Sequence, residues 1–193
     1  VMKDAVLAIE DSRFYDHGGV DYIGMLRAGL AQFGDARSQG ASTITMQVAR
    51  NFYLSTEKTL TRKVYEVLLT WKIESLLTKD QILEAYMNQI FLGQRAHGFA
   101  AAAEIYFGKP LQELNVAEAA MLAGLPKAPS IYNPIVNPKR ANARQQYIID
   151  RMLDNGFINA EQAAAARIEK LRYRSQSEVA VHAEFVAETA RQL

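Results

Sequence analysis

The residue best suited to proton transfer is Glu10, which stands in the segment Glu10-Asp11-Ser12-Arg13-Phe14. On a helix, Glu10 shares a face with Val6, Leu7 and Phe14, because side chains three and four positions apart are neighbours. Apolar neighbours raise the pKa of a carboxyl group, since burial disfavours its charged form. A glutamate of this kind can take or give a proton near neutral pH. Taken alone, the segment favours a simpler interpretation, a surface acid at a helix end before a glycine turn.

A second segment, residues 40–51, combines small, hydroxyl and polar residues and could bind an anion. Ser42 or Thr43 can cap the helix that follows. The N-terminus of a helix offers free N–H groups and a positive dipole, which suit a phosphate group. Three polar side chains then share one face of the helix: Gln47, Arg50 and Asn51. Taken alone, an ordinary capped amphipathic helix is the better explanation of this segment.

A third segment places two cations beside a carboxylate. Lys63 and Arg62 stand three and four residues before Glu66, so all three side chains meet on one helical turn. Two cations could hold a pyrophosphate, with Glu66 orienting a cation or a metal ion. The alternative is a set of exposed helix salt bridges, each contributing only about 0.3–0.5 kcal/mol. For this segment alone, the alternative is the better explanation.

A fourth segment, residues 79–88, predicts a helix with an apolar side, and a turn containing Arg95 follows it. Its core-facing residues are predicted to be Ile82, Tyr86 and Ile90. Glu84 and Asn88 are spaced by four residues, and we expect them to form a buried polar pair that fixes packing. Arg95, just past the helix, is the better candidate for binding an anionic ligand.

Apolar residues recur at intervals of three and four along most of the chain, which predicts helices rather than strands. The expected helices are residues 2–14, 21–33, 43–53, 59–77, 79–91, 99–107, 116–123, 139–155 and a short one from 160. Capping sequences mark three of the starts, at Thr78, Asn115 and Asn159. A short strand could form within 171–181. The sequence therefore predicts an all-α fold built as one domain.

Composition narrows the classes of function. The 193 residues carry a formal charge of +1, which gives no support to nucleic-acid binding by bulk charge. The chain has no cysteine and three widely spaced histidines, so disulfide scaffolds and Cys- or His-based metal sites are not expected. No apolar run reaches the length of about 18 residues that a membrane span requires. The chain opens at Val1 in mid-pattern, which suggests a piece of something longer.

One apolar stripe admits two interpretations. Its members are Ile23, Leu26, Leu30 and Phe33. Such a stripe usually packs into a core. It could instead enter the interface of a bilayer, and the residues by themselves leave this open.

The four segments, in this order, resemble the peptidoglycan glycosyltransferase domain of class A penicillin-binding proteins and of monofunctional transglycosylases. The matching residues are Glu10-Asp11, Phe14, His17 and Gly19, then Gly40 to Gln47, then Arg62-Lys63 and Glu66, then Lys79 to Asn88. Two further segments also match, Gly124 to Ser130 and Arg140 to Met152. The resemblance covers residues 1–170, and five motifs in order with fitting spacings are very specific. Arg50 departs from the lysine found in many members, which keeps the charge and changes its geometry.

The resemblance implies a lysozyme-like all-α fold with a membrane-contacting jaw. It also implies polymerisation of lipid II into β-1,4-linked glycan strands, with inversion at the anomeric carbon and release of undecaprenyl pyrophosphate. Glu10 matches the family's general base, and Glu66 matches a second glutamate that helps the pyrophosphate leave, directly or through Mg²⁺ or Mn²⁺. No tightly bound cofactor and no metal ligand set is expected. The substrate-binding residues it implies are Asp11, Phe14, His17, Ser42, Thr43, Gln47, Arg50, Asn51, Arg62, Lys63 and Arg95.

The same resemblance implies a place and partners. We expect a bacterial cell-wall enzyme at the periplasmic face of the cytoplasmic membrane, inhibited by moenomycin and anchored by a helix absent from this fragment. Its partners would be lipid II, the lipid-linked glycan chain, the membrane surface, and proteins of cell-wall synthesis and of division or elongation. Residues 171–193 look like the start of a connection toward a transpeptidase domain.

Two other functions remain as alternatives. One catalytic glutamate in an all-α fold would also serve a lysozyme-like lytic enzyme. Cleavage of a neutral glycan needs no cations for a pyrophosphate, so Arg50, Arg62 and Lys63 favour transfer from a lipid pyrophosphate. A non-catalytic lipid II-binding module would be favoured by the loss of Glu10 or Glu66, and both residues are present.

Overall fold

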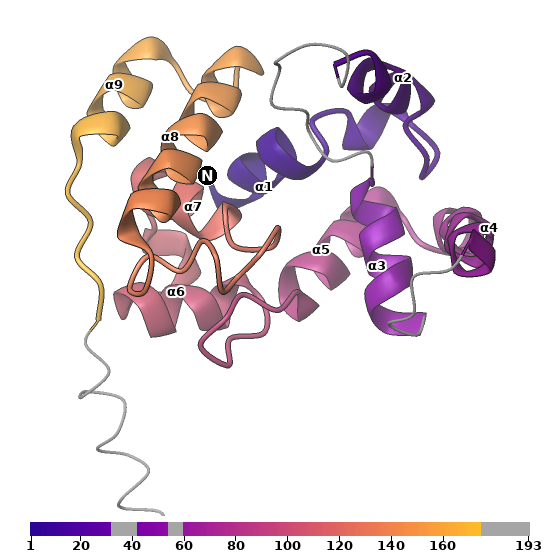
Figure 1. Ribbon diagram of the computed structural model, residues 1–193, viewed down its shortest axis with the longest axis horizontal. Coiled ribbons are helices and arrows are strands. Elements are labelled where there is room, and N and C mark those ends of the chain that lie inside the picture. The colour runs from indigo at the N-terminus through magenta and orange to yellow at the C-terminus, as the bar shows by residue number, and fades with distance from the viewer. Residues whose placement is uncertain (32–41, 54–59, 175–193) are drawn as a thin grey trace, which may run out of the picture.

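The computed structural model describes residues 1–31, 42–53 and 60–174, and within these ranges the chain is helical (Figure 1). The α-helices are α1 Met2–Glu10, α2 Tyr22–Ala31, α3 Ile44–Tyr53, α4 Leu60–Leu76, α5 Lys79–Gln89, α6 Phe99–Phe107, α7 Val116–Ala123, α8 Pro138–Asp154 and α9 Ala160–Ile168. Two 3₁₀ turns lie at Phe14–Asp16 and Leu111–Glu113. In the described ranges, β pairing is limited to an isolated bridge between Phe91 and His97. The predicted all-α class is confirmed.

Local sequence chemistry sets the helix boundaries. The three predicted capping boxes form, since the side chains of Thr78, Asn115 and Asn159 each accept a bond from the backbone N–H three residues on. The partner glutamine or glutamate returns a bond to the cap residue, so two free N–H groups are satisfied at each start. Gly108 ends α6 in the left-handed conformation that glycine adopts without strain.

The core lies where α1, α7 and α8 pack together, at the left of Figure 1. Helix α7 is buried along Ala117–Ala123, and its four alanines let neighbouring helices approach closely. Helix α1 contributes a nearly continuous buried run, which ends one residue before Glu10. Helices α2, α3 and α4 lie at the opposite side of the view, with α5 in contact with α3, α4 and α6. Glu10 therefore stands at the end of a rigid helix, facing the α3 side of the molecule.

The first helix is shorter than predicted. It ends at Glu10, and Asp11 takes an extended backbone with φ −162°. The side chain of Asp11 accepts a hydrogen bond from the backbone N–H of Ile44, at the start of α3. The first N–H groups of α3 need hydrogen-bond acceptors, and Asp11 supplies one of them from outside the helical conformation. The first helix therefore ends before residues 11–14, although their periodicity predicts a helix.

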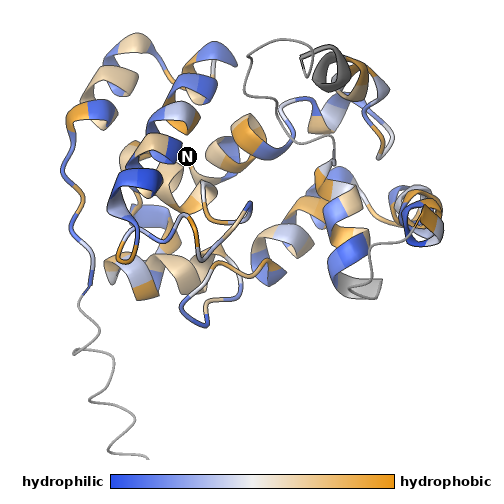
Figure 2. Cartoon of the chain, in the orientation of Figure 1, coloured by the Kyte–Doolittle hydropathy of each residue, from blue (hydrophilic) through white to orange (hydrophobic). Residues whose placement is uncertain are grey.

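The apolar stripes of α2 and α4 are exposed. Ile23 and Leu26 are 58% and 66% exposed, so in the described part of this stripe the core interpretation is wrong. The side chains of Leu30 and Phe33 lie outside the described residues. On α4, the residues that face inward are Glu66, Thr70 and Ile73. Its apolar side chains at helical spacing are largely open to solvent, namely Leu60, Val64, Leu68 and Trp71. Figure 2 shows hydrophobic residues on α2 and α4 as well as on the core helices.

The chain beyond α9 bears on two predictions. Residues 171–174 form no strand, and the rest of the segment that could hold one, 175–181, lies outside the described residues. The backbone N–H of Arg174 donates to the carbonyl of Tyr106, which ties this stretch to the end of α6. Along the described helices, none is both long and apolar enough to cross a membrane.

Candidate active site

Glu10, the last residue of α1, is held by a side chain from α3. The amide nitrogen Nε2 of Gln47 donates to Oε2 of Glu10 at 2.8 Å. The hydroxyl of Tyr86, on α5, lies 3.4 Å from Oε1 of Gln47 and donates to it. Gln47 and Tyr86 are both buried, while Glu10 keeps partial exposure. Side chains from three helices therefore orient this carboxylate, and Glu10 as a whole residue is only partly buried.

The surroundings of Glu10 tune its proton affinity. Burial raises its pKa, and this effect outweighs the hydrogen bond from Gln47 and the charges of Arg144, Lys127 and Arg50, which lower the pKa. Burial also raises the pKa of Tyr86 well above its usual value, and the nearby charge of Glu10 raises it further. Tyr86 thus stays a neutral donor, and Glu10 has the raised pKa that suits a general base.

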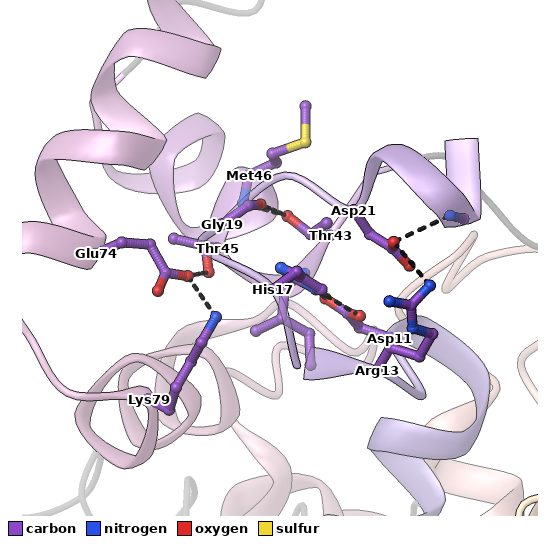
Figure 3. Close-up of polar contacts among 12 residues, drawn as sticks. Asp11, Arg13, His17, Gly19, Asp21, Thr43, Thr45, Met46, Glu74 and Lys79 are labelled. Atoms are coloured by element: carbon purple, nitrogen blue, oxygen red, sulfur yellow. Dashed lines mark hydrogen bonds and ion pairs between the residues drawn. The ribbon is translucent and has the colours of Figure 1, made fainter. Parts of the chain in front are cut away.

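The start of α3 is closed by protein groups (Figure 3). Oδ2 of Asp11 accepts from the N–H of Ile44 at 3.1 Å, and Nε2 of His17 lies 3.0 Å from both oxygens of Asp11. The hydroxyl of Thr43 accepts from the N–H of Met46 and donates to the carbonyl of Gly19. Thr43 and Asp11 thus cap the start of α3, which agrees with the ordinary capped helix that this segment favours when taken alone.

The second glutamate lies on the inward face of α4. Nζ of Lys63 donates to Oε1 of Glu66 at 2.7 Å, and a guanidinium nitrogen of Arg62 lies 3.5 Å from Oε2. The predicted meeting of the three side chains is confirmed. The glutamate is only 1% exposed, so the interpretation as exposed salt bridges is wrong for this partner. Lys63 remains 45% exposed, which leaves its charge accessible to an anion.

The donor set around Glu66 does not suit a metal ion held by the protein. A divalent cation prefers several oxygen ligands, whereas this site offers one carboxylate that already has two cationic partners. Over the described ranges, no group of three or more His, Asp or Glu side chains could hold a metal. The positive charge at this site is therefore better supplied by Arg62 and Lys63 than by a metal ion.

Several predicted substrate contacts are buried instead. Phe14 is 1% exposed and packs in the core, with Nζ of Lys79 lying 4.4 Å from its ring centroid. The side chains of Asp11 and His17 are 4% and 6% exposed, and Thr43 is buried as well. All four side chains are therefore largely buried in this structure, and their role as substrate contacts stays a prediction.

The remaining predicted residues are more open. Ser42 and Arg50 are partly exposed, and Asn51 is exposed. Arg95 is exposed at a turn with φ +61°, and in the described part of the chain it forms no hydrogen bond or ion pair with Glu10 or Glu66. The prediction of a buried pair between Glu84 and Asn88 is wrong, since both are exposed on the side of α5 that faces away from Tyr86.

Sequence reasoning missed two cations that act on Glu10, Lys127 and Arg144. The guanidinium of Arg144 lies 5.6 Å from the ring centroid of Tyr132 and 5.7 Å from that of Tyr147. Their signal was present, because both residues stand in segments that match the family pattern. A third omission is Glu74, which has contacts to α3 and α5 that no local pattern indicates.

Comparisons with known proteins agree on one family. The family model described as Transglycosylase matches residues 1–153. A protein of Cupriavidus necator that carries the name transglycosylase is 64% identical over 173 residues, which are 90% of this chain and 75% of that protein. Penicillin-binding protein 1A of Neisseria flavescens is 58% identical over 195 residues, which cover this whole chain but only 24% of the relative.

A solved structure is similar in fold. It is the crystal structure of penicillin-binding protein 1A from Haemophilus influenzae, with a TM-score of 0.50 and 35% sequence identity. The match covers 77% of this chain and 19% of the other. The chain thus corresponds to a limited part of the penicillin-binding relatives.

Proposed function

The chain belongs to the transglycosylase family, and on that premise we propose that it polymerises lipid II into β-1,4-linked glycan strands for bacterial cell-wall synthesis. The observation that carries the mechanism is the state of Glu10. Its pKa is raised by burial, one of its oxygens is held by Gln47, and the residue keeps access to solvent. A general base needs these properties, since it must be oriented toward the substrate and able to bind the substrate's proton.

In the proposed reaction, Glu10 removes the proton from the 4-hydroxyl of the N-acetylglucosamine of lipid II. The oxygen forms a bond with the anomeric carbon of the lipid-linked glycan chain. The bond from that carbon to the pyrophosphate breaks, and its electron pair leaves with undecaprenyl pyrophosphate. Attack from the opposite face converts an α linkage to β, which is inversion. The proton ends on Glu10.

Cations stabilise the leaving group in this proposal. Lys63 and Arg50 keep exposure and can approach the pyrophosphate, while Arg62 adds charge from a less exposed position. Glu66 contributes by fixing Lys63 and Arg62 in place, since it binds both. Charge that is fixed before the reaction stabilises the transition state without reorganisation. Ser42 and Asn51 are the remaining open residues for the donor, with Arg95 a more distant candidate.

The lipid tails of both substrates place the reaction at a membrane. The exposed apolar residues of α2, among them Ile23 and Leu26, support contact with a bilayer. We therefore place the enzyme at the periplasmic face of the cytoplasmic membrane, with lipid II, the growing glycan chain and other proteins of cell-wall synthesis as partners.

The test is polymerisation of labelled lipid II in detergent by the wild type and by Glu10→Gln, with moenomycin as a control. Polymer that is sensitive to moenomycin from the wild type, and none from Glu10→Gln, is the expected result. Binding of lipid II without polymer in both proteins would instead favour a binding module. Release of soluble fragments from finished glycan would favour a lytic enzyme.

A further inference from the structure

One carboxylate outside the two catalytic glutamates connects three helices. Oε1 of Glu74, on α4, accepts a hydrogen bond from the hydroxyl of Thr45 on α3. The same oxygen accepts a bond from Nζ of Lys79, at the start of α5, at 2.7 Å. Figure 3 shows the three side chains converging. The ion pair is largely shielded, with side chains 13% and 20% exposed, so it is stronger than a surface pair.

The α3 end of this connection lies next to the partner of Glu10. Thr45 is fully buried and stands two residues before Gln47, which holds Glu10. Both residues are in the first turn and a half of α3. A shift of this turn relative to α4 therefore moves the amide of Gln47, and with it the carboxylate of Glu10.

The α4 end lies on the same helix as the second glutamate. Glu74 is two turns beyond Glu66, or about 12 Å along the helix axis. Between them, the hydroxyl of Thr70 donates to the carbonyl of Glu66 at 2.7 Å. The opposite side of α4 is exposed at Leu60, Val64 and Leu68, so among the described residues the packing of this helix lies on its other side. The hydrogen bonds of Glu74 to Thr45 and Lys79 therefore contribute to the position of α4 relative to α3 and α5.

The loop after α1 closes against the same place. A Cβ atom on Gly19 would lie 2.6 Å from Cγ2 of Thr70 and 2.8 Å from Cγ of Glu74. Its carbonyl accepts from Thr43, at the start of α3. Backbone and side chains are in direct contact here, so α3 and α4 have little freedom to move apart without breaking the bond between Thr45 and Glu74.

We propose that Glu74 is a positioning residue, which fixes α4 against α3 and thereby sets the geometry between Glu10 and Glu66. The inference rests on the proposed function, because it assigns the two glutamates to one reaction. Thr45 and Lys79 act through Glu74, the first as the link to α3 and the second as the charge partner that orients its carboxylate.

The kinetic test removes the link and leaves the ion pair. Thr45→Val replaces the hydroxyl with a methyl group of similar size, and Thr45→Ser keeps the hydroxyl. Ser75→Ala is the control, since Ser75 donates to the carbonyl of Lys72 on the exposed side of α4. A misplacement of about 1 Å can lower a rate about 100-fold. We expect kcat of Thr45→Val to fall between about 10-fold and 100-fold, with KM within about threefold of wild type. Thr45→Ser and Ser75→Ala should remain near wild type.

A structural role alone gives a different result. Thr45→Val would then lower the thermal midpoint, while kcat per folded molecule stayed at the wild-type value. That outcome overturns the proposal. So does a loss of rate in Thr45→Val that Thr45→Ser fails to restore.

A second measurement needs no activity and separates the inference from the proposed function. The chain has no cysteine, so spin labels at Lys72→Cys on α4 and Ala143→Cys on α8 report one distance. Both positions are exposed. In double electron–electron resonance, Thr45→Val should broaden or shift the distance distribution, and Thr45→Ser should restore it. An unchanged distribution in Thr45→Val overturns the inference, even if the wild type polymerises lipid II. If Thr45→Val shifts the distribution while the wild type makes no polymer, the coupling between the helices is retained and the proposed reaction is rejected.

Discussion

At the scale of single residues, the behaviour of Glu10 follows from its neighbours rather than from its own chemistry. Burial of Glu10 raises its pKa, and the hydrogen bond from Gln47 and the charges of three cations limit the rise. The result is a carboxylate that can take up a proton at working pH and is held in one orientation. Glu66 shows the opposite arrangement, with two cationic partners in direct contact and almost no exposure.

The first prediction concerns Glu10→Gln. Loss of the base should lower the rate of polymerisation by a factor on the order of 10² to 10⁴ or more. The free energy of unfolding should respond differently, because at higher pH the substitution removes a buried charge. The pKa of Glu10 is raised in the folded state, so the folded protein binds this proton more tightly than the unfolded chain does. Its contribution to stability is present at low pH and is lost as pH rises through the folded pKa.

The stability of Glu10→Gln relative to wild type should therefore increase as pH rises from about 4.5, the ordinary pKa of a glutamate, through the higher pKa of Glu10 in the folded protein. Urea unfolding at several pH values within this interval measures the difference. A stability difference that stays constant or falls with rising pH would contradict the raised pKa.

The second prediction concerns the partner of Glu10. The N–H of Gln47 stabilises the ionised form of the carboxylate, so its removal in Gln47→Leu should raise the pKa of Glu10 further. The acid limb of the pH profile of kcat/KM should move to higher pH. Gln146→Leu is the matched control, because that glutamine bonds to the carbonyl of Arg167 at the surface. Equal pH profiles in the two variants would show that Gln47 does not act on the base.

At the scale of elements, close contacts between helices and turns limit which residues the chain can use. Gly98 begins α6 with φ +80°, and a Cβ atom there would lie 2.5 Å from the carbonyl oxygen of Asn88. Glycine is required at this position for two reasons, the left-handed backbone and the contact with α5. This contact fixes how α5, which carries Tyr86, meets the core helices.

The third prediction compares three glycine substitutions. Gly18→Ala should be nearly neutral, since Gly18 has no neighbour within 4 Å. Gly156→Ala has equal space but φ +72°, so it should destabilise the protein by about 1–2 kcal/mol. Gly98→Ala has both strain and overlap and should destabilise it more than Gly156→Ala does. Chemical denaturation measures the free energy of unfolding of the three variants. Equal losses for Gly98→Ala and Gly156→Ala would mean that the backbone of α5 shifts to make room for the added Cβ atom with no loss of stability.

At the scale of the whole molecule, exposed apolar side chains are concentrated on α2 and α4. Tyr22, Ile23 and Leu26 are each more than half exposed, as are Leu60, Val64 and Leu68. The core helices α1 and α7 instead bury their apolar residues almost completely. This distribution supports the proposal that the side formed by α2 and α4 contacts lipid, while α1 and α7 form the stabilising core.

The fourth prediction tests that division with lipid vesicles. Burial of one large apolar side chain contributes about 1.5–3 kcal/mol, so placing a charge at Leu26 should weaken binding by about tenfold or more. Ile168 is 83% exposed at the end of α9, away from α2, and Ile168→Asp is the control. Co-sedimentation of the protein with vesicles measures both variants. Equal losses for Leu26→Asp and Ile168→Asp would argue against a specific lipid-contacting side.

Much of the fold was predictable because its determinants are local. The capping boxes at Thr78, Asn115 and Asn159 need only residues three positions apart, and all three form as expected. The cluster of Arg62, Lys63 and Glu66 lies within one helical turn, so its existence followed from spacing, although its burial did not. The predicted end of the first helix was wrong because of a contact with a distant element. Asp11 accepts a hydrogen bond from the start of α3 and therefore does not continue the first helix.

The sequence by itself determined the helices, their capped starts and the family, since all three depend on residue types at short spacings. Only the tertiary structure decided which polar groups meet across helices. Gln47 reaches Glu10 over 37 positions of the chain, and Thr45 reaches Glu74 over 29. The same holds for the charges of Lys127 and Arg144 near Glu10. Such contacts depend on how helices pack, and helical periodicity fixes the face of a helix but not the neighbour that this face meets.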